Sequence, residues 1–326
     1  MILDVARHKL YEALLSLVGL ALAMVAMGLA TPLGAMPCGV APLGAMLTTF
    51  EASHPIVSAI VCFVLTLYLA FKATRTTVRT HLYGANSFAV MTLAPLAVMG
   101  LASAGDMLRA VVVAWLVVET LRRLFYAFGS EERKHAIFTA MLAIGALPLV
   151  DSPLSVALIA LPLVLVALRV GGREVVVGVA GALLPLFAYA YVTWCSGGDF
   201  VASLASPFRA MGEPSGMEVA DYFTMPRVVM VATLGVMTLV GGYVYLRNRL
   251  ALSLVARQAW RFIISTLVVG IAVVALLPST TSATYAALGI VVAMVLPMVM
   301  LRLSTMLSVA LYILLLSGGV ASMLAS

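Results

Sequence analysis

The sequence predicts an all-α fold, a polytopic transmembrane helix bundle of about 11 spans (range about 9 to 11) with a cytoplasmic N-terminus. Composition is the first observation behind this prediction. Hydrophobic residues make up 63% of the 326 residues and charged residues only 10%, whereas soluble chains carry about 45–50% and about 25%. The other observations are apolar runs long enough to cross a bilayer and basic residues confined to one side of them. Lipid can cover this much apolar surface, so no water-excluding core is needed.

The spans are taken as apolar runs bounded by charged or turn-forming residues. The first run, near the N-terminus, is longer than the apolar region of a secretory signal, so we expect it to be retained as a helix. Two of the runs are short and are joined by Asp151-Ser152-Pro153, and Arg302 alone separates the last two. The predicted spans are 11–30, 55–72, 87–104, 107–126, 136–150, 154–169, 174–194, 228–246, 262–279, 283–301 and 303–325.

The basic residues predict the orientation. With the N-terminus in the cytoplasm and alternating spans, all of the 19 lysines and arginines except Arg109, Arg209 and Arg227 fall on the cytoplasmic side. Cytoplasmic loops of membrane proteins carry an excess of Lys and Arg, and this bias sets the orientation. Because the basic residues are scattered among short loops instead of gathered on one face, the sequence predicts no nucleic-acid partner.

Acidic residues dominate the opposite, outer side. Its longest loop, residues 195–227, contains the stretch GEPSGMEVADYF and a preceding segment, VASLASPFRAM, that can form an amphipathic helix on the membrane surface. A solvated connector and a lid over an outer cavity are both open interpretations of this loop. The seven acidic residues placed outside are Glu51, Asp106, Asp151, Asp199, Glu213, Glu218 and Asp221.

Asp106 and Arg109 begin the span 107–126 from its outer side. One interpretation is an N-cap carboxylate with an ion-paired arginine one turn later. The other is a carboxylate and a guanidinium that face a shared outer cavity and bind a phosphate or sugar head group. Glu119, nearer the inner end of the same span, precedes Arg122 and Arg123, and we expect a local ion pair there.

Asp151 lies in the sequence VDSPLS between two short spans. A capping carboxylate followed by proline is typical of a helix start, which is the simpler interpretation. Because the flanking spans are short, Asp151 could also be a buried carboxylate kept for function. The candidate catalytic residues are Glu51, Asp106 and Asp151, and the candidate substrate-binding residues are Arg109, Arg209 and Asp221.

No cofactor or metal motif occurs in the sequence. The four histidines are far apart and Cys38, Cys62 and Cys195 have no metal-ligand spacing, so we predict no cofactor and no metal. We expect Cys62 to be a small buried residue within a helix. Cys38 and Cys195 fall on the same side of the membrane, and a disulfide between them stays open because sequence does not fix their distance.

Residues 86–195 resemble a family of uncharacterised polytopic inner-membrane proteins of Gram-negative bacteria, known only as a domain of unknown function. The resemblance implies an inner-membrane location and a similar topology, and it supplies no active site. The features that carry it are Asn86-Ser87 at a helix start, Leu121-Arg122-Arg123 at a helix end, Asp151 with Pro153 after a helix of small residues, and Gly181 with Pro185.

The sequence leaves the function open, and whether the chain is an enzyme is uncertain. One hypothesis is an inner-membrane protein that handles lipid-linked sugars of the cell envelope, in the manner of glycosyltransferases that use polyprenyl-phosphate donors, by analogy of layout alone. The rival hypothesis is a non-catalytic scaffold or assembly subunit of an envelope complex, since small residues favour tight helix packing. A flippase or small-solute transporter is a third. The expected partners are membrane lipids, with a lipid-linked sugar or another envelope protein.

Overall fold

The computed structural model is a helical bundle, and it describes residues 10–30, 41–84, 87–103, 105–127, 132–167, 170–213 and 222–324. No β-strand occurs in these ranges. The helices are α1 (Leu10–Ala30), α2 (Pro42–Ser53), α3 (Pro55–Arg79), α4 (Val90–Leu101), α5 (Met107–Ala127), α6 (Arg133–Val150), η2 (Ser152–Ser155), α7 (Val156–Ala167), α8 (Gly172–Cys195), α9 (Phe200–Ala210), α11 (Met225–Asn248), η3 (Arg249–Ala251), α12 (Leu254–Leu276), α13 (Ser282–Met300) and α14 (Thr305–Leu324).

Every predicted span coincides with a helix, so the all-α bundle is confirmed. Within the described ranges, seven helices are long and apolar enough to cross a bilayer, namely α3, α6, α8, α11, α12, α13 and α14. Of the remainder, α4 and α7 have only 12 residues each, and α5 carries four charged residues. The count of about 11 spans therefore stays a prediction.

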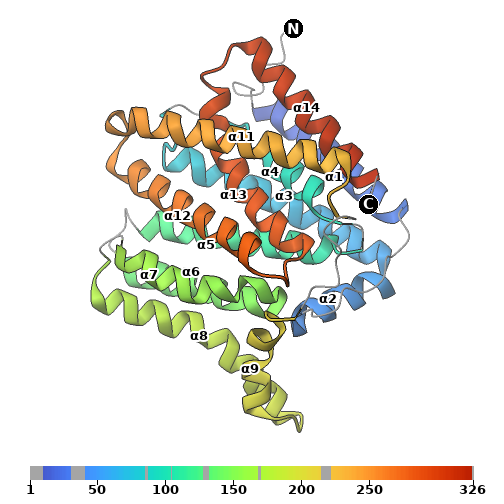
Figure 1. Cartoon of the computed structure of the whole chain (residues 1–326), viewed down its shortest axis with the longest axis vertical. Helices are drawn as coiled ribbons and strands as arrows, with labels where there is room; N and C mark the ends of the chain where they lie inside the picture. The colour runs from blue at the N-terminus through green and yellow to red at the C-terminus, as the bar shows by residue number, and fades with distance from the viewer. Residues whose placement is uncertain are drawn as a thin grey trace.

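Helix α13 lies at the centre of the bundle and the other long helices surround it (Figure 1). In its apolar window 94% of the residues are buried, against 28–33% for α3, α8, α11, α12 and α14. All twelve residues of α4, which packs beside α13, are buried as well. The outer helices present large apolar side chains to their surroundings, including Leu239, Leu276 and Ile313. Such exposure is stable in lipid and costly in water.

Helices α6 and α8 are in close contact because glycines let their backbones approach. A Cβ added at Gly145 of α6 would overlap the carbonyl oxygen of Ala182. A Cβ at Gly181 of α8 would lie 2.6 Å from the carbonyl oxygen of Phe138. Small residues at helix contacts are the usual device for tight packing in membranes. Both glycines therefore fix how α6, and with it Asp151 at its end, is held in the bundle.

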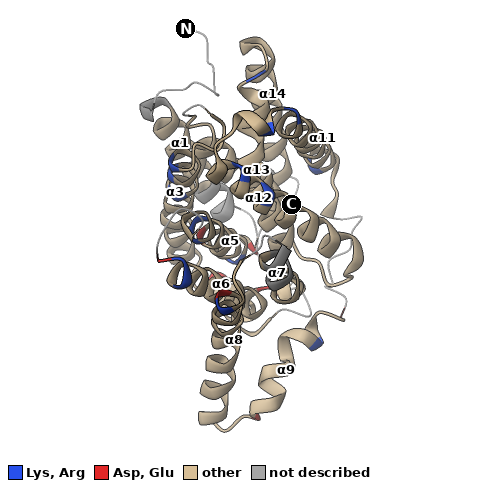
Figure 2. Cartoon of the chain, turned by 90° about the vertical axis from the view of Figure 1, so that its left-hand side faces the viewer, with Lys and Arg blue, Asp and Glu red and all other residues tan. Residues whose placement is uncertain are grey.

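The fold brings the predicted inner and outer residues to opposite ends of the bundle. Arg79 lies in the last turn of α3, Arg133 begins α6 and Arg247 lies in the last turn of α11. Figure 2, which faces this end of the bundle, shows Lys and Arg at the near ends of several helices. We call this end the inner end and the opposite one, where α5 and α13 begin, the outer end; which one faces the cytoplasm stays a prediction.

The cysteines are placed without a disulfide among the described residues. Cys62 is buried within α3, as expected, and Cys195 is a free, exposed thiol at the end of α8. Cys38 lies outside the described residues, so the structure does not address its pairing.

Candidate functional site

Glu51 lies near the end of α2, a short helix that the sequence did not predict. Pro42 begins this helix, and its twelve residues span only about 18 Å, too little to cross a bilayer. Glu51 is buried and its Oε2 accepts a hydrogen bond of 3.1 Å from the backbone N–H of Leu108. Glu51 thereby caps the first turn of α5 from a different helix, where the positive end of the helix dipole favours a carboxylate.

Asp106 and Arg109 form a buried ion pair beside this cap. The Arg109 Nη2 atom lies 2.6 Å from Oδ2 of Asp106, and the same oxygen accepts a hydrogen bond from the Ser282 hydroxyl of α13. The predicted ion pair one turn apart is confirmed. The capping role predicted for Asp106 is wrong, because its Oδ2 binds Arg109 and Ser282 and its Oδ1 has no partner, while Glu51 accepts the N–H of Leu108.

Asp151 is also turned toward α13. Its Oδ1 accepts a hydrogen bond of 2.8 Å from the Thr281 hydroxyl and its Oδ2 one of 2.6 Å from the Thr284 hydroxyl. It makes no side-chain cap of the following 3₁₀ helix, so the capping interpretation is wrong. The physical reason is that Asp151 lies at the enclosed end of α6, where a carboxylate needs donors and the α13 hydroxyls supply them. The alternative interpretation, a buried carboxylate, is the observed one.

These groups form one site, which we call the polar cluster. It consists of Glu51, Asp106, Arg109 and Asp151 together with the hydroxyl residues Thr281, Ser282 and Thr284. The structure thus brings all three candidate catalytic carboxylates around one candidate binding residue, Arg109, whose charge acts on each of them.

The polar cluster carries more acid than base and keeps unused hydrogen-bonding capacity. Arg109 is 0% exposed, Asp151 1%, Asp106 5% and Glu51 9%, so Glu51 is the most accessible of the four. Oδ1 of Asp106 and both Nε and Nη1 of Arg109 are buried without a hydrogen-bond partner. Buried polar groups are nearly always paired, so these three atoms are available to bind water or a ligand.

Burial also changes how the carboxyls outside the spans titrate. Burial raises the pKa of Glu51 to about 7, with the nearby Asp106 charge adding to the rise and the Leu108 N–H opposing it. Burial likewise raises the pKa of Asp151, against the lowering effect of Arg109 and the two threonine hydroxyls. Glu51 is therefore poised to exchange a proton near neutral pH.

The other two candidate binding residues are not part of the polar cluster. Arg209 is exposed in the last turn of α9, and none of the cluster's hydrogen bonds or ion pairs includes it. Asp221 lies outside the described residues, as does Glu218. Helix α9 itself occupies most of the predicted amphipathic segment and is capped by Asp199, which accepts hydrogen bonds from the N–H groups of Val201 and Ala202. Its predicted place on the membrane surface stays a prediction.

A second buried polar arrangement, centred on Arg227, was also missed from the sequence. Its guanidinium donates to Ser322 Oγ (2.9 Å) and to the carbonyl oxygens of Tyr222 (2.9 Å) and Ala102 (3.2 Å). It also lies 4.3 Å above the ring of Tyr222. Three acceptors from separate segments thus hold one buried cation, an arrangement that joins α4, α11 and α14 at the outer end.

Only a weak signal could have revealed the hydroxyl residues. The stretch PSTTSATY, residues 278–285, is an uncharged polar interruption between two apolar runs of the C-terminal third. Thr281 caps α13 with its own hydroxyl, so the stretch reads as an ordinary helix start. Nothing in the sequence shows that its hydroxyls reach two carboxylates more than a hundred residues away.

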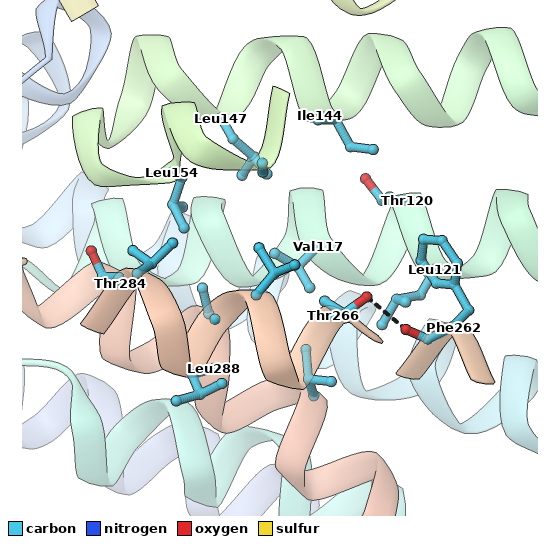
Figure 3. A pocket seen from close by; sticks show the side chains of 16 residues that line it. Val117, Thr120, Leu121, Ile144, Leu147, Leu154, Phe262, Thr266, Thr284 and Leu288 are labelled. Carbon is cyan, nitrogen blue, oxygen red and sulfur yellow. Dashed lines mark hydrogen bonds between the residues drawn. The ribbon is translucent and has the colours of Figure 1, made fainter. Parts of the chain in front are cut away.

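An apolar pocket adjoins the polar cluster. It has a volume of about 70 Å³ and lies between α5, α6, α7, α12 and α13. Thr284 lines one end and Phe262 the other, with Val117, Leu147 and Leu288 between them (Figure 3). Thr266 also lines it, but its hydroxyl donates to the carbonyl of Phe262 in its own helix. The pocket therefore runs along the bundle from the hydroxyl that binds Asp151 toward the inner half.

At the inner half of α5, Glu119 binds both arginines that follow it. Its carboxylate accepts hydrogen bonds from Nε of Arg122 at 2.8 Å and Nε of Arg123 at 2.7 Å. The predicted local ion pair is confirmed. Among the described residues no cluster of metal-ligating side chains occurs.

The seven apolar helices and the exposed apolar rim define the chain as a helical membrane protein. No protein-family model matches the chain, and no curated protein or solved structure matches it. The resemblance of residues 86–195 to a family of inner-membrane proteins therefore stays a hypothesis.

Proposed function

We propose that this chain is a multi-pass protein of the bacterial inner membrane that handles a lipid-linked sugar, in the manner of glycosyltransferases that use polyprenyl-phosphate donors. One observation carries the proposal: Thr284 lines the apolar pocket and also binds Asp151 of the polar cluster. An elongated apolar pocket suits a hydrocarbon chain, and a charged cluster at its outer end suits a polar head group. The two chemistries that a lipid-linked sugar needs therefore meet at one residue.

In such a transfer, the residues of the polar cluster would have different roles. Arg109 would bind the lipid phosphate, since its Nε and Nη1 are free donors and guanidinium pairs well with phosphate. Glu51, with a pKa of about 7, would act as general base. The acceptor hydroxyl attacks the anomeric carbon, the new C–O bond forms, the bond from that carbon to the phosphate oxygen breaks, and the proton passes to Glu51. Asp106 and Asp151 hold Arg109 and the α13 hydroxyls in position.

The test replaces the carboxylates one at a time in a strain that depends on the protein. We expect Asp106→Asn and Asp151→Asn to abolish an envelope-glycan phenotype while the amount of protein in the membrane stays normal. Thr266→Val, which changes the same pocket without touching the polar cluster, is the matched control and should keep the phenotype intact. Full activity of both Asp variants would exclude the proposal.

Purification in a gentle detergent separates this proposal from its rival. Polyprenyl lipid that copurifies with the wild type and is lost from the Asp151→Asn variant supports lipid-linked sugar handling. A stoichiometric protein partner, with no bound polyprenyl lipid, would instead identify a scaffold or assembly subunit.

A further inference from the structure

A second cavity, at the inner end of the bundle, is lined by cations. It has a volume of about 400 Å³, which is several times that of the apolar pocket. Helices α3 and α5 form most of its wall, and Val255, in the first turn of α12, completes it. Its charged lining residues are Lys72, Arg75, Arg79 and Arg122, and no acidic residue lines it. We call it the basic pocket.

The spacing of the cations along their helices lets them line the same pocket. Lys72, Arg75 and Arg79 are three, four and seven positions apart on α3, so they share a helix face. Arg122 and Tyr126 are one turn apart on α5 and lie on the opposite wall. Cations brought this close repel each other, and the repulsion is relieved when an anion binds between them.

Within the described ranges, most of this positive charge is not neutralised by an acidic side chain. Glu119 pairs with Arg122 and Arg123. In the part of the chain that the structure describes, no carboxylate pairs with Lys72, Arg75 or Arg79. Lys72 lies 4.8 Å from the centre of the Tyr68 ring. The hydroxyls of Thr76 and Thr80 donate to carbonyls of their own helix, so Lys72, Arg75 and Arg79 are the pocket cations left to bind a ligand.

We propose that the basic pocket binds a phosphate-bearing anion at the inner face of the membrane. Two free guanidiniums and an ammonium match the oxygens of a phosphate monoester or diphosphate. The first turn of α12 adds the positive end of a helix dipole. Phe125 and Tyr126 give one wall an aromatic character, which suits an organic group attached to the phosphate. The phosphate belongs either to an anionic lipid or to a soluble phosphate compound.

The basic pocket is distinct from the general excess of cations on this side. Arg247 and Arg249 also lie at the inner end, at the end of α11 and in η3, and they do not line the basic pocket. They therefore supply a matched control for attraction to a charged membrane surface. The basic pocket lies at the opposite end from the polar cluster, so this proposal does not depend on the function proposed above.

The experiment compares three forms of the full chain: wild type, the pocket variant Arg75→Gln/Arg79→Gln and the control variant Arg247→Gln/Arg249→Gln. Binding of inorganic pyrophosphate is measured by calorimetry in lipid-free detergent micelles. Retention of phosphatidic acid is measured by native mass spectrometry after reconstitution in phosphatidylcholine nanodiscs with and without that lipid. All four arginines are at least partly exposed, and an unchanged thermal midpoint would show that each variant folds.

We expect the pocket variant to bind at least one probe about tenfold more weakly and the control variant to stay within about twofold of the wild type. Pyrophosphate binding that the pocket variant loses identifies a soluble phosphate compound. Phosphatidic acid retention without pyrophosphate binding, again lost in the pocket variant, identifies a lipid head group. The proposal fails if the wild type binds neither probe, or if the control variant loses as much binding as the pocket variant.

Discussion

The hydroxyl of Thr284 donates a 2.6 Å hydrogen bond to the carboxylate of Asp151, across 133 positions of the chain. The bond joins the end of α6 to the first turn of α13. Asp151 is almost completely buried, so the cost of burying its carboxyl group must be offset by hydrogen-bond donors of this kind.

Thr284→Val keeps the side-chain shape and removes the donor. We expect it to lower the free energy of unfolding by about 1–3 kcal/mol, because a buried charged acceptor is left with one hydroxyl fewer. The thermal midpoint of the purified protein in detergent reports the change. Thr266→Val is the control, since that hydroxyl donates 2.9 Å to a carbonyl of its own helix. Equal losses in the two variants would show that the bond to Asp151 is not special.

Glu51 predicts a pH dependence of stability. Its pKa rises from 4.5 to about 7 on folding, so the folded state holds a proton more tightly than the unfolded state. The stabilisation is fully present below pH 4.5 and is lost as pH rises through about 7, with a slope of at most about 1.4 kcal/mol per pH unit. Glu51→Gln should flatten thermal midpoints measured from pH 5 to 8, and an unchanged profile would refute the assignment.

Arg227 predicts that a planar guanidinium is required at the outer end of α11. Arg227→Lys keeps the charge and cannot reach Ser322, Tyr222 and Ala102 together. We expect the free energy of unfolding to fall by about 1.5–3 kcal/mol, seen as a lower thermal midpoint. Arg247→Lys at the inner end of the same helix is the control and should leave the midpoint unchanged. An Arg227→Lys variant as stable as this control would mean that the three hydrogen bonds of Arg227 contribute nothing to stability.

Gly145 predicts a steric limit at the contact of α6 and α8. Gly145→Ala would push its new Cβ into the backbone of Ala182, which cannot move aside without shifting a helix. We expect the free energy of unfolding to fall by about 1–3 kcal/mol, or the variant to fail to accumulate in the membrane. Gly242→Ala on α11 meets nothing within 4 Å and is the matched control. Membrane accumulation and thermal midpoints should separate the two alanine variants.

The orientation is tested by reporter fusions after residues 80, 130, 210 and 255. We expect cytoplasmic activity at 80, 130 and 255 and extracytoplasmic activity at 210, because Lys and Arg are retained on the cytoplasmic side. A cysteine placed near Glu213 should react with a membrane-impermeant reagent in cells stripped of their outer barrier. Protection of that cysteine would invert the topology and move the polar cluster to the cytoplasmic face.

The helices could be predicted from the sequence because a helix that faces lipid consists of a long run of apolar residues. Helix α2 was missed because its twelve residues include Thr48, Thr49 and Glu51, so they form no apolar run long enough to cross a bilayer. The number of crossings could not be predicted with the same ease. Helices α4 and α5 show why. A helix that is buried inside the bundle can be shorter, as α4 is, or more charged, as α5 is, than a helix that faces lipid.

The carboxylates of the polar cluster could be singled out individually, because acidic residues in an apolar chain are conspicuous. Their convergence on Arg109 depends on how α2, α5 and α6 pack, and no local pattern encodes it. The hydroxyl residues were missed for a different reason. Threonines within apolar helices usually bond to their own backbone, as Thr266 does, and the sequence offers nothing that distinguishes Thr266 from Thr284.

The enclosure of α13 has a consequence for how the bilayer acts on the chain. A helix that meets almost no lipid does not sense acyl-chain length directly, so membrane thickness reaches Ser282 and Thr284 through the tilt of the lipid-exposed helices α3, α8, α11, α12 and α14. We therefore expect a thinner or thicker bilayer to tilt the lipid-exposed helices first, while the enclosed helix α13 keeps its packing.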